Sequence, residues 1–241
     1  MPNDYFQFQQ FRIEQADCAM KVSTDACLLG AAADLTGATR LLDIGTGTGL
    51  LALMAAQRHA TVDIEAVEID AAASVQATAN AAASPWAGRI CIHSLSLAEY
   101  AATRPAPFSH IICNPPFFRQ SLRSPDAART TARHEAADTL SFDALADFAA
   151  DFLLADGLLT VLLPPPEMQA FERVAAATGL QPATRLLVRH RPGSRPLRHI
   201  VGFRREAGAT QETELSIRTA TDEGEYSAEF RALLSGFYLA L

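Results

Sequence analysis

From Arg40 onward, short apolar runs alternate with longer segments of helical periodicity. Apolar runs at 40–44, 63–69, 89–93, 109–113 and 157–164 predict buried strands, and two more strands are expected near 185–190 and 198–203. Segments 50–58, 71–83, 142–154 and 167–178 have the pattern of helices. This alternation predicts an α/β fold, with a mostly parallel twisted sheet and helices on both faces. We expect one domain over 1–241, with an N-terminal cap segment at 1–36 and a core at 37–241.

The composition is that of an ordinary globular protein, with 241 residues, 49% hydrophobic and 20% charged. No apolar run approaches the roughly 18 to 20 residues of a membrane span, and the N-terminus lacks the pattern of a signal peptide. The four cysteines are scattered and none has metal-ligand spacing, so we expect free thiols and no metal site. These features predict a cytoplasmic protein.

Net charge is −7, from 20 basic and 27 acidic residues, which by itself argues mildly against a nucleic-acid partner. The arginines are nevertheless clustered, and the stretch 185–205 contains no acid. Two of its arginines, Arg191 and Arg195, flank a turn predicted at Pro192-Gly193-Ser194 and are expected to project into solvent on one side. The alternative is that these arginines pair with acids such as Glu167 or Glu172. The arginines expected to bind RNA are Arg119, Arg123, Arg129, Arg133, Arg191 and Arg195.

The first predicted strand ends in Asp43-Ile-Gly45-Thr-Gly47-Thr-Gly49, directly before a helix. Glycines allow a sharp turn and a close approach of backbone to ligand. The loop is not the dinucleotide fingerprint, because Leu50 stands where the third glycine belongs. A Walker loop is excluded as well, since the only lysine is Lys21. The remaining pattern, an aspartate followed by three alternating glycines, suits an adenosyl ligand without a pyrophosphate.

The second predicted strand ends in Val67-Glu68-Ile69-Asp70. An acid at this place can accept hydrogen bonds from both hydroxyls of a ribose. Glu68 directly follows the apolar part of the strand, so we prefer it to Asp70, and we include its neighbour Ile69 in the cofactor site.

The fourth predicted strand ends in Asn114-Pro115-Pro116-Phe117. The prolines stiffen the chain, and the residue before a proline is pushed towards extended geometry. An amino group conjugated to a purine or an amide is a poor nucleophile, because its lone pair is delocalised. The Asn114 side-chain oxygen and the Pro115 carbonyl could accept from such a group and localise that lone pair, while Phe117 stacks on the flat substrate. We expect Asn114 to contact the cofactor as well.

Together these motifs resemble the amino-directed class I methyltransferases, and further motifs resemble the bacterial tRNA1(Val) (adenine-37-N6)-methyltransferase family nearly end to end. The further motifs are Phe6-Gln-Phe8-Gln-Gln10-Phe11, Cys18-Ala-Met-Lys21-Val-Ser-Thr24-Asp25, Leu28-Leu-Gly30-Ala, Ser84-Pro-Trp86-Ala-Gly-Arg89-Ile, Tyr226-Ser and Phe237-Tyr238. The resemblance implies a Rossmann-like core, S-adenosylmethionine as methyl donor and tRNA as partner. It also implies that Lys21, Thr24 and Asp25 lie over the cofactor and target pocket.

The chain departs from the family pattern at two places. Where the family usually has an acid for the cofactor's adenine, this chain has Ser94-Leu-Ser96-Leu97, so Ser96 and Leu97 are expected to take that contact. Phe117 stands where the family often has tyrosine. The phenylalanine leaves open a guanine-N2 methyltransferase for ribosomal RNA. A protein glutamine methyltransferase is a further alternative, although it would not need the two arginine stretches. A catalytically silent RNA-binding protein on this fold would not need Asp43, Gly45, Gly47, Glu68 and Asn114 together.

Overall fold

The protein is described by a computed structural model covering residues 4–116, 140–206, 208–221 and 224–240. Its centre is an eight-stranded sheet in the order β10-β8-β9-β7-β6-β3-β4-β5. Only β9 runs antiparallel to its neighbours. The strands are β3 (Arg40–Ile44), β4 (Asp63–Val67), β5 (Ile90–His93), β6 (Phe108–Cys113), β7 (Leu153–Leu163), β8 (Gln181–Arg189), β9 (Pro196–Arg204) and β10 (Gln211–Ser216).

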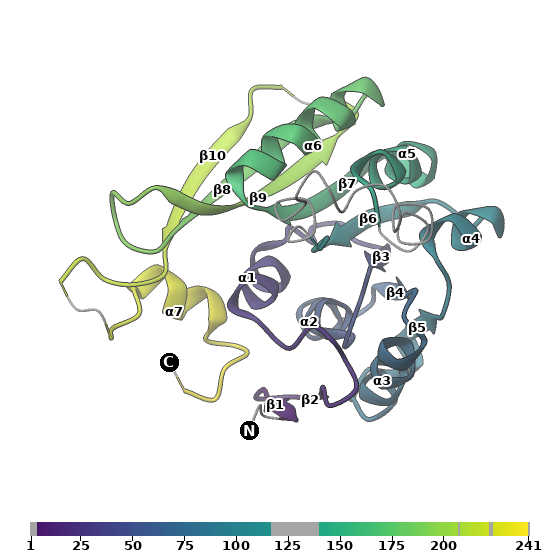
Figure 1. Ribbon diagram of the computed structural model, residues 1–241, viewed down its shortest axis with the longest axis horizontal. Coiled ribbons are helices and arrows are strands. Elements are labelled where there is room, and N and C mark those ends of the chain that lie inside the picture. The colour runs from purple at the N-terminus through teal and green to yellow at the C-terminus, as the bar shows by residue number, and fades with distance from the viewer. Residues whose placement is uncertain (1–3, 117–139, 207, 222–223, 241) are drawn as a thin grey trace, which may run out of the picture.

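Helices cover both faces of this sheet (Figure 1). One face carries α1 (Thr24–Ala32), α2 (Leu50–Arg58) and α7 (Ala228–Leu234). The other carries α4 (Leu97–Ala102), α5 (Phe142–Phe152) and α6 (Pro165–Ala177). Each face has its own hydrophobic core, and α3 (Ala71–Ala82) packs on β5. The predicted α/β class with a mostly parallel sheet is therefore confirmed.

Several elements differ from the sequence-based prediction. The helix expected at 142–154 ends at Phe152, and the strand expected to begin at 157 begins at Leu153. The sequence did not predict β10, which is mostly polar because it is an edge strand held by pairing with β8. Helices α1, α4 and α7 were not predicted either. Residues 1–36, expected as a cap, contain α1, which packs in the helical layer, and a hairpin of β1 (Tyr5–Gln7) and β2 (Arg12–Glu14).

The two ends of the chain pack together beside α2 and α7. The Gln9 side chain donates to the carbonyl oxygens of Ser235 at 2.8 Å and Tyr238 at 2.6 Å. The Phe8 ring is fully buried, stacks on Phe11 at 4.6 Å between ring centroids, and lies 6.0 Å from the Tyr238 ring. Phe8 and Phe11 from the N-terminal segment and Tyr238 from the C-terminal segment thus form one aromatic cluster. This cluster fixes the hairpin to the body of the protein.

Gly49 offers a test of the turn between β3 and α2. Its φ is +84°, and an added Cβ would lie 3.5 Å from the backbone of Ala77. We expect Gly49→Ala to lower the free energy of unfolding by roughly 1 to 2 kcal/mol, the cost of a left-handed conformation for an L-residue. The control is Gly88→Ala, where a Cβ meets nothing within 4 Å. Urea denaturation of both variants would measure the difference, and equal stabilities would contradict the assignment.

Candidate active site

The sheet brings three loops into one row at its carboxyl edge. Ile44 of β3 is paired with Val67 of β4 on one side and with Cys113 of β6 on the other. The residues directly after these positions are Gly45, Glu68 and Asn114. Neighbouring strands lie about 4.8 Å apart, so the three residues start side by side. The chain continues from β3 towards β5 on one side and then returns to β6 on the other, so the row lies at the switch point where such sheets bind ligands.

The glycine loop has the backbone geometry that its sequence predicts. Gly45, Gly47 and Gly49 have φ values of +70°, +57° and +84°. The amides of Gly45 and Thr46 both donate to the carbonyl oxygen of Val67, at 3.0 and 3.1 Å, which ties the loop to β4. A Cβ at Gly45 would meet nothing within 4 Å. The loop therefore presents bare backbone to open space.

Glu68 and Asp70 have different local roles. The two carboxylate oxygens of Glu68 accept from the Gly47 amide at 2.8 Å and from the Asp70 amide at 3.0 Å. Each oxygen keeps a second lone pair for a further donor, as a ribose with two hydroxyls requires. Asp70 is the N-cap of α3 and accepts from the Ala73 amide at 2.8 Å. Ile69, between them, is 45% exposed.

Asp43 is fully buried under the loop. Its Oδ2 accepts from the Thr46 hydroxyl at 2.5 Å and the Ala52 amide at 3.2 Å. Its Oδ1 has no hydrogen-bond partner among the described residues. Burial raises the pKa of Asp43 to about 7, and the hydrogen bonds from Thr46 and Ala52 only partly oppose that effect.

Asn114 is half-buried and is followed by a buried Pro115 and an exposed Pro116. The Asn114 Oδ1 atom is itself buried, and no described residue donates a hydrogen bond to it. A buried acceptor without a donor is costly, and it points to a partner that arrives with the ligand. Phe117 lies outside the described residues.

The N-terminal segment crosses the glycine loop. The Cys18 sulfur lies 3.8 Å from where a Cβ of Gly47 would be. Lys21 Nζ donates to the carbonyl oxygens of Gln15 and Ala16, so its ammonium holds the segment itself together. Thr24 is the exposed first residue of α1, and Asp25 forms a 2.7 Å ion pair with Arg198 of β9.

Sequence reasoning missed Asn80, which fixes this segment to the loop. Its buried side chain donates to the carbonyl oxygens of Glu14 at 2.8 Å and Thr48 at 2.9 Å, and it accepts from the Glu14 amide at 2.9 Å. All of its hydrogen bonds join α3, the N-terminal hairpin and the glycine loop. The available signal was an asparagine on the buried side of an alanine-rich helix.

Ser96 has a structural partner of its own. It is the N-cap of α4, and its hydroxyl forms a capping box with Glu99, at 2.7 Å to the carboxylate. The half-buried Leu97 packs against the hydrophobic core beneath α4. Glu99, which the sequence reading did not select, therefore brings a carboxylate to this loop.

Three of the seven late arginines form ion pairs with acids, in part as the alternative proposed. Arg185 pairs with Glu172, Arg189 with Glu214 and Arg198 with Asp25, each at 2.7 Å. The predicted turn is present, and the Ser194 hydroxyl closes it by donating to the Arg191 carbonyl at 2.8 Å.

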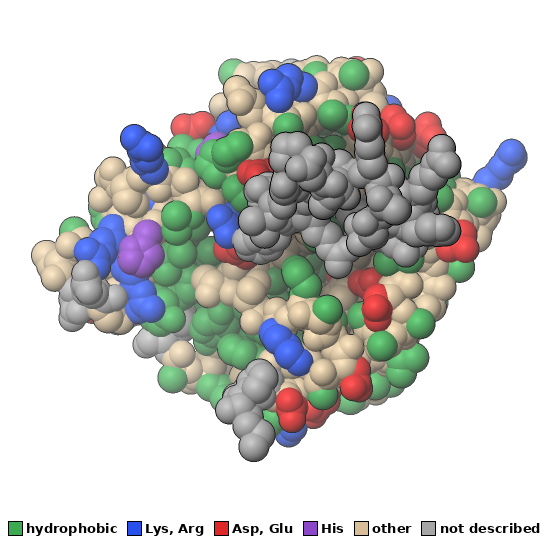
Figure 2. Space-filling view, in the orientation of Figure 1, with side chains coloured by type: hydrophobic (Ala, Val, Ile, Leu, Met, Phe, Trp, Pro, Cys, Tyr) green, Lys and Arg blue, Asp and Glu red, His purple; other side chains and the backbone are tan. Residues whose placement is uncertain are grey.

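Arg195 at this turn is exposed as expected, whereas Arg191 is half-buried with its Nε atom buried, contrary to the expectation that both project into solvent. Figure 2 shows arginine and histidine side chains gathered at the left end of the molecule, where Figure 1 shows the β8–β9 turn. Arg119, Arg123, Arg129 and Arg133 lie outside the described residues.

Within the described ranges, no three potential metal ligands cluster. In the same ranges, no helix combines the length and apolarity that crossing a bilayer requires.

Comparison with known proteins defines the class. The methyltransferase small domain family matches residues 20–143, which includes the glycine loop, Glu68 and Asn114. Among solved structures, a predicted O-methyltransferase from Agrobacterium tumefaciens is 20% identical with a TM-score of 0.62, covering 88% of this chain and 96% of that one. The ribosomal protein L11 methylase of Lactobacillus delbrueckii subsp. bulgaricus is 17% identical with a TM-score of 0.55, covering 80% and 84%. Fold and site thus define a class I, S-adenosylmethionine-dependent methyltransferase.

Two relatives narrow the class to a family. A tRNA1(Val) (adenine(37)-N6)-methyltransferase of Phocaeicola vulgatus is 41% identical over 99% of both chains. A protein of the same name from Yersinia pestis is 41% identical over 97% of this chain and 93% of its own. This chain belongs to the tRNA1(Val) (adenine(37)-N6)-methyltransferase family.

The residues at the carboxyl edge fit S-adenosylmethionine. The open space at Gly45 leaves room for the cofactor against the loop backbone, and the remaining lone pairs of Glu68 suit its ribose hydroxyls. When bound, the cofactor supplies an electrophilic methyl group on a sulfonium.

The titration of Asp43 gives a prediction for stability. Its pKa of about 7 lies above the ordinary value of 3.8, so between these values the folded state holds a proton that the unfolded chain releases. The free energy of unfolding should therefore fall as pH rises through this window and level off above it. We expect wild type to lose roughly 1 kcal/mol per pH unit relative to Asp43→Asn between about pH 5 and 7. Urea denaturation at several pH values would measure it, and parallel curves would show that Asp43 does not titrate there.

Proposed function

We propose that this protein transfers a methyl group from S-adenosylmethionine to the N6 amino group of adenine 37 in tRNA1(Val). The names of its relatives support this tRNA and this position. The whole chain would act as one methyltransferase domain in the cytoplasm. The observation that carries the proposal is the buried Oδ1 atom of Asn114, to which no described residue donates a hydrogen bond. It lies in the same row as the glycine loop and Glu68.

The proposed chemistry uses acceptors rather than an acid or a base. Asn114 Oδ1 and the Pro115 carbonyl oxygen would accept from the two N–H groups of the adenine amine and localise its lone pair. The nitrogen forms a bond to the methyl carbon as the methyl–sulfur bond breaks, and the nitrogen then loses one proton to solvent. Most of the acceleration would come from holding the amine in line with the methyl group. Phe117 would stack on the base.

Mass spectrometry tests the reaction directly. Nucleosides from tRNA incubated with the protein and isotope-labelled cofactor should contain labelled N6-methyladenosine. Label in N2-methylguanosine, or in a glutamine side chain of added protein, would replace the adenine proposal with one of the two alternatives that the sequence left open.

Asn114→Ala should reduce methyl transfer on the order of 100-fold or more, as for groups that act mainly in the transition state. S-adenosylmethionine affinity should stay nearly unchanged. Asn114→Asp retains an acceptor oxygen at the same place, so its loss should be smaller. Single-turnover rates with labelled cofactor would measure both variants. A rate within a few-fold of wild type for Asn114→Ala would reduce Asn114 to a turn residue.

Glu68→Ala should weaken S-adenosylmethionine binding by roughly 1.5 to 3 kcal/mol, the range for hydrogen bonds to a charged group. The matched control is Asp70→Ala, which removes the N-cap of α3 and should cost about 0.5 to 2 kcal/mol of stability with little effect on affinity. Calorimetric titration and urea denaturation separate the two effects. Equal losses of affinity in both variants would mean that Glu68 acts only through the loop.

Arg195 is proposed to contact the RNA backbone. Arg195→Gln should reduce the slope of log affinity for tRNA against log salt by about 0.7 to 0.9, the contribution of one neutralised phosphate. The control is Arg104→Gln, an exposed arginine between α4 and β6, near the opposite edge of the sheet. Equal slopes for wild type and Arg195→Gln would place the RNA elsewhere.

A further inference from the structure

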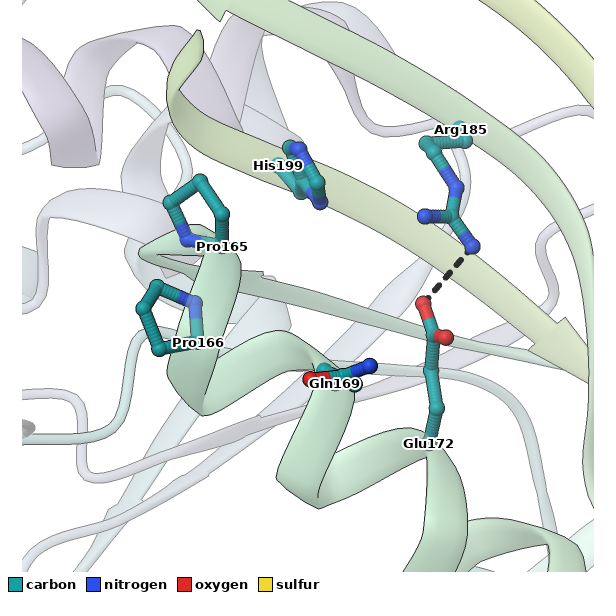
Figure 3. A pocket seen from close by; sticks show the side chains of 6 residues that line it. All are labelled: Pro165, Pro166, Gln169, Glu172, Arg185 and His199. Carbon is teal, nitrogen blue, oxygen red and sulfur yellow. Dashed lines mark hydrogen bonds and ion pairs between the residues drawn. The ribbon is translucent and has the colours of Figure 1, made fainter.

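A groove of about 460 Å³ lies between α6 and the strands β8 and β9. Figure 3 shows Pro165 and Pro166 at one end, in the first turn of α6. The ion pair of Arg185 with Glu172 lies at the other end. Gln169 and His199 lie between the two ends. No step of the methyl transfer uses these side chains.

The strand register relates this groove to the candidate active site. Cys113 of β6 is paired with Val161 of β7, and Leu163 of β7 is paired with His199 of β9. His199 therefore lies two strands from β6 and at the level of Pro115 along the sheet. Two strand spacings are roughly 10 Å. This is the scale of one or two nucleotides in a single-stranded RNA whose bases are splayed out.

The lining favours a flat, uncharged group over a phosphate. Arg185 is neutralised by Glu172 at 2.7 Å and has a second carboxylate, that of Glu212, at 3.8 Å. Burial, together with the charge of Arg185, lowers the pKa of His199, so its imidazole is neutral at pH 7. Two proline rings and an imidazole offer flat faces, and the Gln169 amide offers both a donor and an acceptor.

We propose that this groove holds the base of a nucleotide within two positions of the target adenine, so that the protein reads a second base of its RNA. The inference rests on the proposed function, because it takes the RNA to enter at the row of Gly45, Glu68 and Asn114. A base between proline and imidazole faces gains stacking, and the Gln169 amide can bond to its edge.

The test is a binding cycle between protein variants and abasic RNAs. The RNAs are anticodon stem-loops in which one nucleotide near the target is replaced by an abasic residue. The proteins are wild type, Gln169→Ala and His199→Ala. The control is Gln181→Ala, an exposed glutamine at the far end of β8. Affinity is measured by fluorescence anisotropy at one salt concentration, and thermal melts and S-adenosylmethionine titrations check each variant.

One abasic position within two nucleotides of the target should weaken wild-type binding about 10-fold, the scale of one stacked base. His199→Ala and Gln169→Ala should each weaken binding of intact RNA several-fold and cause no further loss on that abasic RNA. The proposal would be overturned if the His199→Ala and Gln169→Ala variants bound every RNA with wild-type affinity. It would also be overturned if these variants lost the same affinity for all RNAs, the abasic ones included. The binding cycle needs no turnover. If the wild-type protein bound RNA but transferred no methyl group to adenine, the proposed function would be wrong. The binding cycle would still test whether the groove holds a base.

Discussion

Parallel pairing of β3 with β4 on one side and with β6 on the other is the constraint on which the candidate site depends. Ile44 is level with both Val67 and Cys113, so the chain leaves three neighbouring strands at one height. A shift of one residue in either pair would turn alternate side chains to the wrong face of the sheet. Since both faces are buried under helices, the hydrophobic cores hold the register and thereby hold Gly45, Glu68 and Asn114 together.

Polar contacts then add to this frame what hydrophobic packing cannot supply. Asn80 bonds to both Glu14 and Thr48, so the N-terminal hairpin and the glycine loop share one buried amide. Asp25 and Arg198, separated by 173 residues in sequence, connect the start of α1 to β9. Both contacts lie near the carboxyl edge of the sheet. The N-terminal segment is therefore held at the site by a few polar side chains. Loss of Asn80 would remove its hydrogen bonds to Glu14 and Thr48, and loss of Arg198 would remove its ion pair with Asp25.

The distribution of arginines carries a more general lesson about charge. A stretch of sequence without acids looks basic, but its strands pair with strands and helices that supply the acids: Glu172 from α6, Glu214 from β10 and Asp25 from α1. Ion pairing inside the fold leaves Arg195 exposed at the β8–β9 turn. An RNA surface on this protein depends on arginines at the turns rather than on those along the strands.

The sequence by itself determined the α/β class and the succession of strands β3 to β9 along the chain. It also determined the motifs that follow three of these strands, at Gly45 to Gly49, Glu68 and Asn114 to Pro116. Those features are local, because strand and helix periods, glycine spacing and paired prolines act over a few residues. The caps at Asp70 and Ser96 are local as well, since Ser96 and Glu99 have the spacing of a capping box. Only the tertiary structure decided that Arg191 is half-buried and that polar β10 joins the sheet. It also decided that Pro165 and His199 line one groove. Each of these outcomes depends on a backbone geometry or a partner set by packing across distant segments, which neither residue type nor spacing along the chain encodes.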